Sequence, residues 1–234
     1  MNDSVIVAEL LSATKWYFDQ KNLSLKNAIS LRCQLSVENQ KDIRLYYSQY
    51  FTGLLSATEL FLEKNYQNIE KFKGRLELAL SFDEHPNGPD NYSYLRELRN
   101  SIIHRGLDVT SAAHVKNDFP LFVAPSPITN RSGNKTYDSF GFYLIEVISK
   151  CERVIGNVFL SHFEECGLFE VKFSQDKLME NLLQSITDNK VMPEWAKKMA
   201  LESVESVKFE EIHRSNINNL KETLQYNALA NNNA

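Results

Sequence analysis

An arginine, an asparagine and a histidine lie close together near the middle of the chain, at Arg99, Asn100 and His104. A guanidinium group is a permanent, forked cation suited to phosphate oxygens, and an imidazole exchanges protons near neutral pH. Arg99 is therefore a candidate phosphate clamp and His104 a candidate general acid or base. On a helix, Asn100 lies one turn before His104 and can orient the imidazole or the phosphate. These residue types suit chemistry at a phosphate group.

The sequence around these residues predicts a helix over residues 94–105. Ser93 or Asp90 can cap its start, and the Asn-Gly-Pro turn at residues 87–89 is expected to exclude an earlier start. Gly106 can adopt a positive φ, so the helix should end at Arg105. One narrow apolar stripe should bury the helix, and it consists of Leu95, Leu98 and Ile102.

The spacing of the candidate residues sets a geometric limit. On one helix, Arg99 and His104 project about 140° apart, so the two head groups meet only if the long Arg99 side chain reaches around the helix. Arg96 shares a face with Asn100 and His104. A simpler alternative remains open, in which Arg99 is a solvated or ion-paired edge residue and His104 a favourable cation at a helix C-terminus.

The pattern of Arg99, a polar Asn100 and His104 near the end of a helix resembles the signature of the HEPN superfamily. In these all-helical domains, an arginine followed after four to six residues by a histidine marks a metal-independent ribonuclease site. The resemblance covers about residues 42–163. It implies a homodimer whose two motif helices face each other across a cleft and form a composite site. It also implies a toxin or phage-defence effector, restrained by an antitoxin or regulatory protein.

The expected reaction is cleavage of single-stranded RNA or tRNA by attack of the ribose 2′-hydroxyl. His104 would transfer the proton, Arg99 would stabilise charge on the phosphate, and Asn100 would orient one of them. Arg96 and Arg105 are possible RNA-binding residues, although each is equally an ordinary surface charge. The products would be a 2′,3′-cyclic phosphate and a 5′-hydroxyl, with no metal ion and no cofactor.

Composition limits the class of protein. The 234 residues are 43% apolar and 24% charged, which is ordinary for a globular chain with a well-buried core. A formal net charge of −4 argues against a general nucleic-acid coat but leaves room for a local basic cleft. Cys33, Cys151 and Cys166 share no close spacing, so neither a disulfide framework nor a zinc ribbon is expected. The apolar run near residue 5 is too short for a signal peptide or a membrane span, so a cytoplasmic protein is expected.

Helical periodicity predicts an all-α fold, a HEPN-like antiparallel bundle with additional N- and C-terminal helices. The expected units are N-terminal helices packed on the core, the bundle, a helical extension and a disordered tail, at residues 1–41, 42–170, 171–225 and 226–234. Residues 108–115 should add a short helix, and residues 116–136 a long loop. The other expected helices cover residues 4–19, 25–38, 42–66, 69–82, 137–163, 176–186, 194–207 and 210–226.

No other motif for catalysis is present: the chain lacks a phosphate-binding glycine loop, a zinc-protease motif and a nucleophile elbow. Asp83, Glu84 and His85 are adjacent, but Pro86 marks a turn, so a solvated helix terminus is expected rather than a metal site. Two non-enzymatic hypotheses therefore compete with the nuclease. One is a non-catalytic HEPN-like interaction or dimerisation module, and the other is a helical scaffold unrelated to that superfamily.

Overall fold

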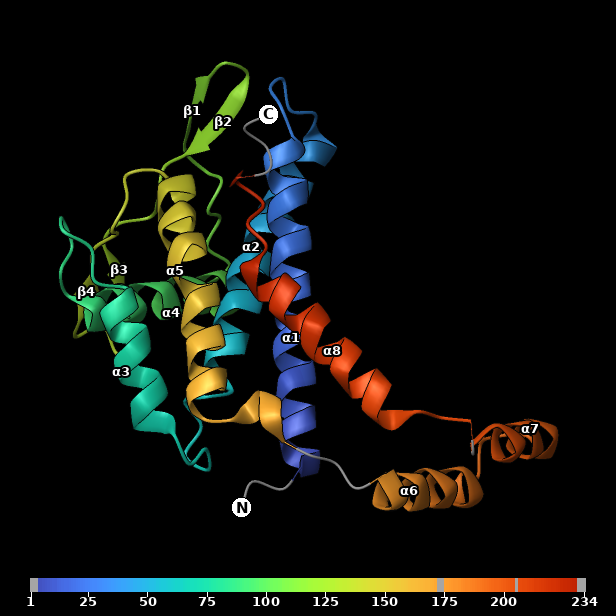
Figure 1. Cartoon of the computed structure of the whole chain (residues 1–234). Coiled ribbons are helices and arrows are strands. Elements are labelled where there is room, and N and C mark those ends of the chain that lie inside the picture. Colours follow the sequence, from blue (N-terminus) through green and yellow to red (C-terminus); the bar gives the residue numbers. More distant parts are fainter. Residues whose placement is uncertain (1–3, 172–174, 205, 231–234) are drawn as a thin grey trace.

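A computed structural model describes residues 4–171, 175–204 and 206–230. Most of these residues are helical, which confirms the predicted all-α class (Figure 1). The strands in this part of the chain form two short antiparallel hairpins, β1 (Ala113–Lys116) with β2 (Phe119–Phe122) and β3 (Ile128–Thr129) with β4 (Thr136–Tyr137). The helices are α1 (Ser4–Ser30), α2 (Val37–Glu59), α3 (Ile69–Ala79), α4 (Gly88–Arg105), α5 (Leu144–Glu165), the 3₁₀ turn η1 (Leu168–Glu170), α6 (Gln175–Asp188), α7 (Glu194–Val204) and α8 (Phe209–Gln225).

The helices α1 and α2 pack side by side and run in opposite directions (Figure 1). The two separate helices predicted over residues 4–19 and 25–38 were wrong, because α1 runs unbroken from Ser4 to Ser30 and ends within the second predicted range. The chain turns before α2, where the Ser36 hydroxyl accepts a hydrogen bond of 3.1 Å from the Asn39 amide. The unit boundary expected between residues 41 and 42 therefore lies inside α2. The apolar side of α1 continues into the core through Leu25, Ala28 and Ile29.

Gly53 lies at the contact between α1 and α2. A Cβ atom at this position would lie 2.8 Å from the Tyr17 carbonyl oxygen and 3.2 Å from the Lys21 Cβ. The absence of a side chain at Gly53 therefore allows the two helices to pack closely.

The helix that carries the candidate site, α4, begins six residues earlier than predicted. The Asn87 side chain caps it by accepting a hydrogen bond of 3.2 Å from the Asp90 amide. Pro89 lies in the first turn, where a missing N–H and a fixed φ are favourable, so the Asn-Gly-Pro turn starts the helix instead of excluding it. The predicted end is confirmed, because Gly106 has a φ of 67° and its amide returns to the Ser101 carbonyl.

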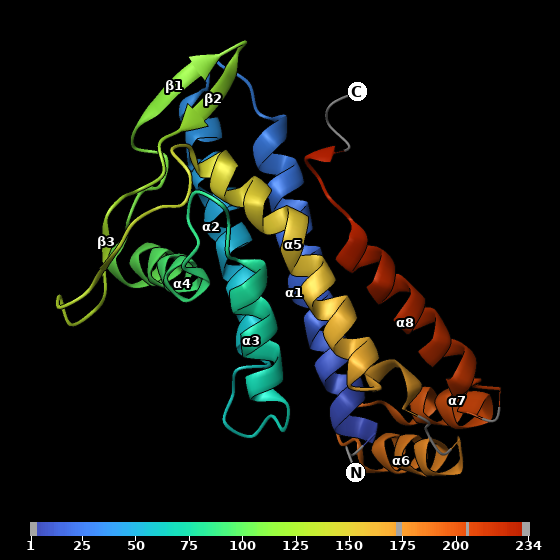
Figure 2. The ribbon, with the colours of Figure 1, turned by 60° about the vertical axis from the view of Figure 1, so that its left-hand side comes forward.

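The apolar stripe of α4 packs where it was expected, although against partly different neighbours. Leu95 and Leu98 are fully buried, and Ile102 packs against the core from its edge. The predicted neighbours were the helices over residues 42–66 and 137–163. The structure places α4 across α2 and α3, with β3 and β4 along another side (Figure 2). This position leaves one long face of α4 in solvent.

Residues 107–143 differ from the prediction. The helix expected over residues 108–115 is absent; most of β1 lies in that range, and β2 pairs with it from the segment expected to be a loop. Asn117 and Asp118 connect the two strands with positive φ values, which these residue types tolerate well in a two-residue turn. The following helix, α5, starts seven residues later than predicted, where the Glu146 carboxylate accepts the Phe142 and Tyr143 amides at 2.8 and 3.1 Å.

The C-terminal helices attach to the bundle through α8, which packs against α1 and α5. Where α8 packs on α5, a Cβ atom on Gly156 would lie 2.0 Å from the Leu224 carbonyl oxygen. The glycine therefore lets the backbone of α8 approach α5 closely. The helices α6 and α7 pair with each other and project away from the bundle (Figure 1). The disordered tail predicted from residue 226 was wrong for residues 226–230, because Ala228 is fully buried; residues 231–234 lie outside the described part.

A buried ion pair connects α1 to α5. The Lys21 Nζ lies 2.6 Å from Glu152 Oε1, and the two side chains are only 4% and 1% exposed. The Tyr50 hydroxyl donates to the same carboxylate oxygen at 2.8 Å, and Lys21 also donates to the Asn22 side chain at 2.8 Å. The second oxygen, Glu152 Oε2, accepts no hydrogen bond from the described residues. This carboxylate therefore depends on Lys21 for its charge compensation.

Among the described helices, none combines the length and the hydropathy that crossing a membrane requires.

Candidate functional site

The exposed face of α4 carries the candidate residues in a fixed order around the helix. Arg96 and Ile103 lie on its outer side, and Asn100 is half-buried between them. Arg99 lies on the flank toward α2, and His104 is exposed in the last turn. Because α4 is a regular helix, the angle of about 140° expected between Arg99 and His104 applies to it.

Arg99 is held on its flank by Glu59, the last residue of α2. Its Nη2 donates a charge-assisted hydrogen bond to Glu59 Oε1, and its side chain is 16% exposed. The buried Arg99 Nε has no hydrogen-bond partner among the described residues. The guanidinium group is thus turned toward α2, and no ion pair or hydrogen bond joins it to His104 within the described chain.

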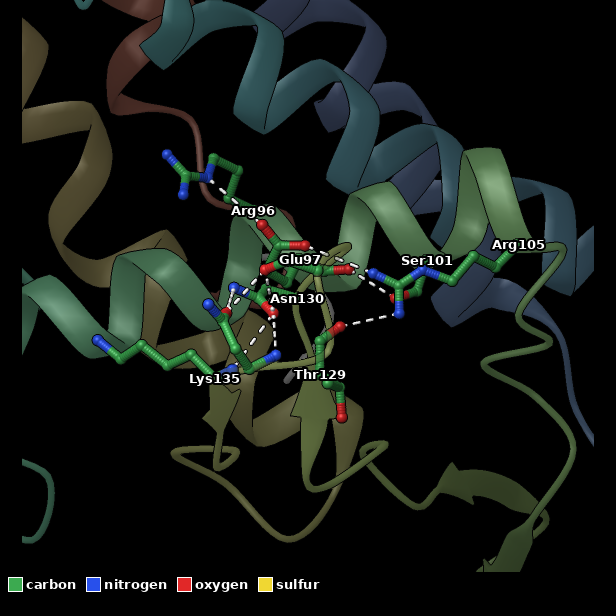
Figure 3. A network of polar contacts seen from close by, with 9 residues as sticks. Arg96, Glu97, Ser101, Arg105, Thr129, Asn130 and Lys135 are labelled. Atoms are coloured by element: carbon green, nitrogen blue, oxygen red, sulfur yellow. Dashed lines mark hydrogen bonds and ion pairs between the residues drawn. The ribbon is translucent and has the colours of Figure 1, made fainter.

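The two predicted accessory residues, Arg96 and Arg105, lie on either side of one buried carboxylate (Figure 3). The side chain of Glu97 is 8% exposed; its oxygens lie 3.8 Å from Arg96 Nε and 3.5 Å from Arg105 Nη2. Arg105 also donates a hydrogen bond of 2.8 Å to the Thr129 carbonyl oxygen on β3. The structure therefore brings Arg96 and Arg105 together around Glu97, and about half of each arginine side chain stays exposed.

Asn100 and His104 are less constrained than the arginines. Neither side chain makes a hydrogen bond or ion pair to any residue in the described part of the chain, including each other. His104 occupies the last turn of α4, where a cation interacts favourably with the helix dipole. One copy of the chain thus presents the three motif residues on one helix without assembling them into a single site.

The sequence reasoning missed the two carboxylates, Glu59 and Glu97. Glu59 lies 40 residues before Arg99, so no local spacing pattern connects them. Glu97 could have been singled out from the sequence, because it lies seven residues before His104 and therefore on the same side of the predicted helix.

Other candidate centres are structural in character. Burial raises the pKa of the Cys151 thiol, and burial also raises the pKa of Cys166, so neither is an activated nucleophile. Phe82 and His85 form an isolated antiparallel bridge around the turn that holds Asp83 and Glu84. The described residues contain no group of three or more His, Cys, Asp or Glu side chains arranged to hold a metal ion.

A buried histidine, His162, lies in the last turn of α5 and belongs to the core. His162 is fully buried among aromatic rings, and a hydrogen bond of 2.6 Å joins its Nε2 to the Tyr66 hydroxyl. Burial, together with the positive charges of Arg75 and Lys71, lowers the pKa of His162 to about 4. The folded chain therefore keeps this imidazole neutral in mildly acidic solution.

This lowered pKa predicts a pH-dependent stability. The unfolded chain binds a proton at His162 below about pH 6.5, whereas the folded chain does so only near pH 4. The free energy of unfolding should therefore decrease as the pH is lowered from 6.5 to 4. Replacing His162→Gln removes this titration. We expect the stability difference between wild type and the variant to shrink by about 2 kcal/mol from pH 6.5 to 4 in urea unfolding. A difference that does not change with pH would contradict the assignment.

No known protein family, curated protein or solved structure matched this chain significantly. The resemblance of the α4 motif to a known superfamily therefore depends on the motif residues and their spacing. A function can therefore be inferred only from the geometry of α4 and its neighbours.

Proposed function

We propose that this chain is a metal-independent endoribonuclease of the HEPN type, with a site that forms where two copies of α4 meet. The observation that carries the proposal is the placement of Arg99 and His104 on different flanks of one solvent-exposed helix face. Arg99 is partly exposed and paired with Glu59, and His104 is exposed at the end of the helix. A phosphate clamp and a proton-transfer group are therefore available on the same surface.

A two-fold dimer supplies the contact that one helix lacks. If two α4 helices face each other about an axis parallel to them, Arg99 of one copy lies on the same edge as His104 of the other. The two residues then differ by about 7 Å along the helix axis, a distance that an arginine side chain spans. Ile103, an exposed apolar residue between them, is suited to the centre of such a contact.

The proposed reaction uses the RNA's own nucleophile. One imidazole removes the proton of the ribose 2′-hydroxyl, whose oxygen attacks the adjacent phosphorus, and the bond from phosphorus to the 5′-oxygen breaks. The same imidazole, protonated by that transfer, then donates the proton to the leaving oxygen. Arg99 stabilises the negative charge that builds on the phosphate, and Asn100 positions the phosphate or the imidazole. Arg96 and Arg105 would contact neighbouring phosphates.

Substrate chemistry tests this proposal directly. Wild-type protein should cut a fluorescent single-stranded RNA or a tRNA in the presence of EDTA and leave a 2′,3′-cyclic phosphate. A matched RNA with deoxyribose at the cleaved nucleotide should remain intact, because the attacking hydroxyl is absent. Cleavage that stops in EDTA, or cutting of the deoxyribose substrate, would overturn the proposed mechanism.

One observation favours a second candidate, a non-catalytic interaction module. All three arginines on the exposed side of α4 already face carboxylates, Arg99 facing Glu59 and the other two facing Glu97. In such a module these pairs would stabilise the surface and leave no cation for phosphate. A wild-type dimer that cuts no RNA, with any natural protein partner removed, would support the module.

As a nuclease, the chain would act as a toxin or defence effector under the control of an antitoxin or regulatory protein.

A further inference from the structure

Glu59 occupies an unusual position for an acidic residue. It is the last residue of α2, where the exposed carbonyl groups of the helix make a negative end and disfavour a carboxylate. Its side chain is 39% exposed and makes its ion pair with Arg99. The carboxylate at this helix end is compensated by that arginine.

The base of this ion pair is rigid. Thr58, the residue before Glu59, is buried, and a hydrogen bond of 3.1 Å joins its hydroxyl to that of Tyr92 on α4. Burial raises the pKa of Tyr92 to about 12, so this hydroxyl stays neutral at the pH of an assay. The end of α2 and the first half of α4 are therefore joined beside the Arg99 side chain.

The pair leaves part of the guanidinium group without a partner: the Arg99 side chain is 16% exposed, and its buried Nε makes no hydrogen bond to a described residue. One amino group of Arg99, Nη2, donates to Glu59 Oε1, and Arg99 makes no second hydrogen bond within the described residues. An unpaired arginine on a helix surface samples many rotamers, which costs entropy when the side chain is ordered on a ligand. The Glu59 carboxylate orders the Arg99 side chain before RNA binds, so less entropy is lost on binding.

We propose that Glu59 is a positioning residue that holds Arg99 in the direction required to stabilise the reacting phosphate. This inference rests on the proposed ribonuclease function. Glu59 acts through Arg99 and does not contact the reacting atoms. Its charge and its length both matter, since the carboxylate must reach Nη2 from the end of α2.

Two substitutions at Glu59 and one nearby control test this role. Glu59→Gln keeps the size of the side chain and removes its charge, and Glu59→Asp keeps the charge on a shorter stem. Glu63→Gln removes a charge from an exposed residue four positions later, which makes no ion pair in the described part of the chain. We expect kcat on single-stranded RNA to fall about 10- to 100-fold for Glu59→Gln with KM within about twofold, because the arginine is misplaced in the transition state.

Glu59→Asp should recover part of the lost kcat, and Glu63→Gln should match wild type. A second measurement does not depend on catalysis: NMR of the Arg99 guanidinium should show restricted rotation in wild type and free rotation in Glu59→Gln. An active wild type with an unchanged kcat in Glu59→Gln would overturn the role of Glu59 and leave the nuclease standing. A raised kcat would overturn it too, since Glu59 would then restrain Arg99. A wild type that cuts no RNA would overturn both proposals.

Discussion

Replacing His104→Ala or Arg99→Ala is expected to lower the rate of RNA cleavage by about 10²-fold or more, the usual effect of removing a general acid–base group or a transition-state contact. His104 is exposed, so its removal should leave stability within the usual surface range. Loss of the partly exposed pair between Arg99 and Glu59 should cost about 1 kcal/mol or less. Initial rates on a fluorescent RNA, with circular dichroism as the folding check, measure this prediction.

Two further variants calibrate these losses. Asn100→Ala should reduce the rate less than the other two substitutions, because a positioning group transfers no proton. Arg153→Ala removes an exposed arginine from α5 and should leave cleavage unchanged. If Arg99→Ala and His104→Ala both retain wild-type rates while the protein cuts RNA, the chemistry belongs to other residues.

The largest effect on stability is expected at the buried ion pair between α1 and α5. Lys21→Met would leave the Glu152 carboxylate charged and nearly inaccessible to water, which typically costs about 3–5 kcal/mol. A methionine fits the space, because Lys21 lies against the rings of Phe18 and Tyr50. Urea unfolding should therefore show a much lower midpoint for this variant.

A compensating substitution separates charge from packing. Adding Glu152→Gln to Lys21→Met removes the orphaned charge and keeps an acceptor for the Tyr50 hydroxyl. The double variant should recover more than half of the lost stability, since replacing both partners of a buried pair is often nearly neutral. Additive losses in the double variant would show that shape, and not charge, sets the stability at this position.

The parts of the fold that were predicted correctly depend on local patterns. The apolar stripe of α4 places Leu95 and Leu98 in the core, and Gly106 ends the helix, because both signals act within a turn or two. The parts predicted wrongly are those where one residue type has two meanings. In the sequence, Pro89 predicts a barrier to helix, although in a first turn it favours one. The polar pair of Asn117 and Asp118 forms a hairpin turn within a segment expected to be a loop.

The sequence predicts the residues of the candidate site but not all of their partners. The residue types and spacing of Arg99, Asn100 and His104 are visible in the sequence, and so is the angle between them on a helix. The partners that direct the arginines depend on tertiary packing. Glu59 meets Arg99 only because α4 lies across the end of α2. Similarly, Arg105 reaches the Thr129 carbonyl only because β3 packs beside α4.

The central claim, a site shared between two copies, is tested most directly by mixing two inactive proteins. Arg99→Ala and His104→Ala subunits, co-expressed in equal amounts, would form mixed dimers in about half of all cases. Each mixed dimer holds one site with an intact arginine from one copy and an intact histidine from the other. The mixture should therefore regain about a quarter of the wild-type rate, although each variant alone is inactive. A mixture as inactive as its two components, beside an active wild-type dimer, would contradict the shared site.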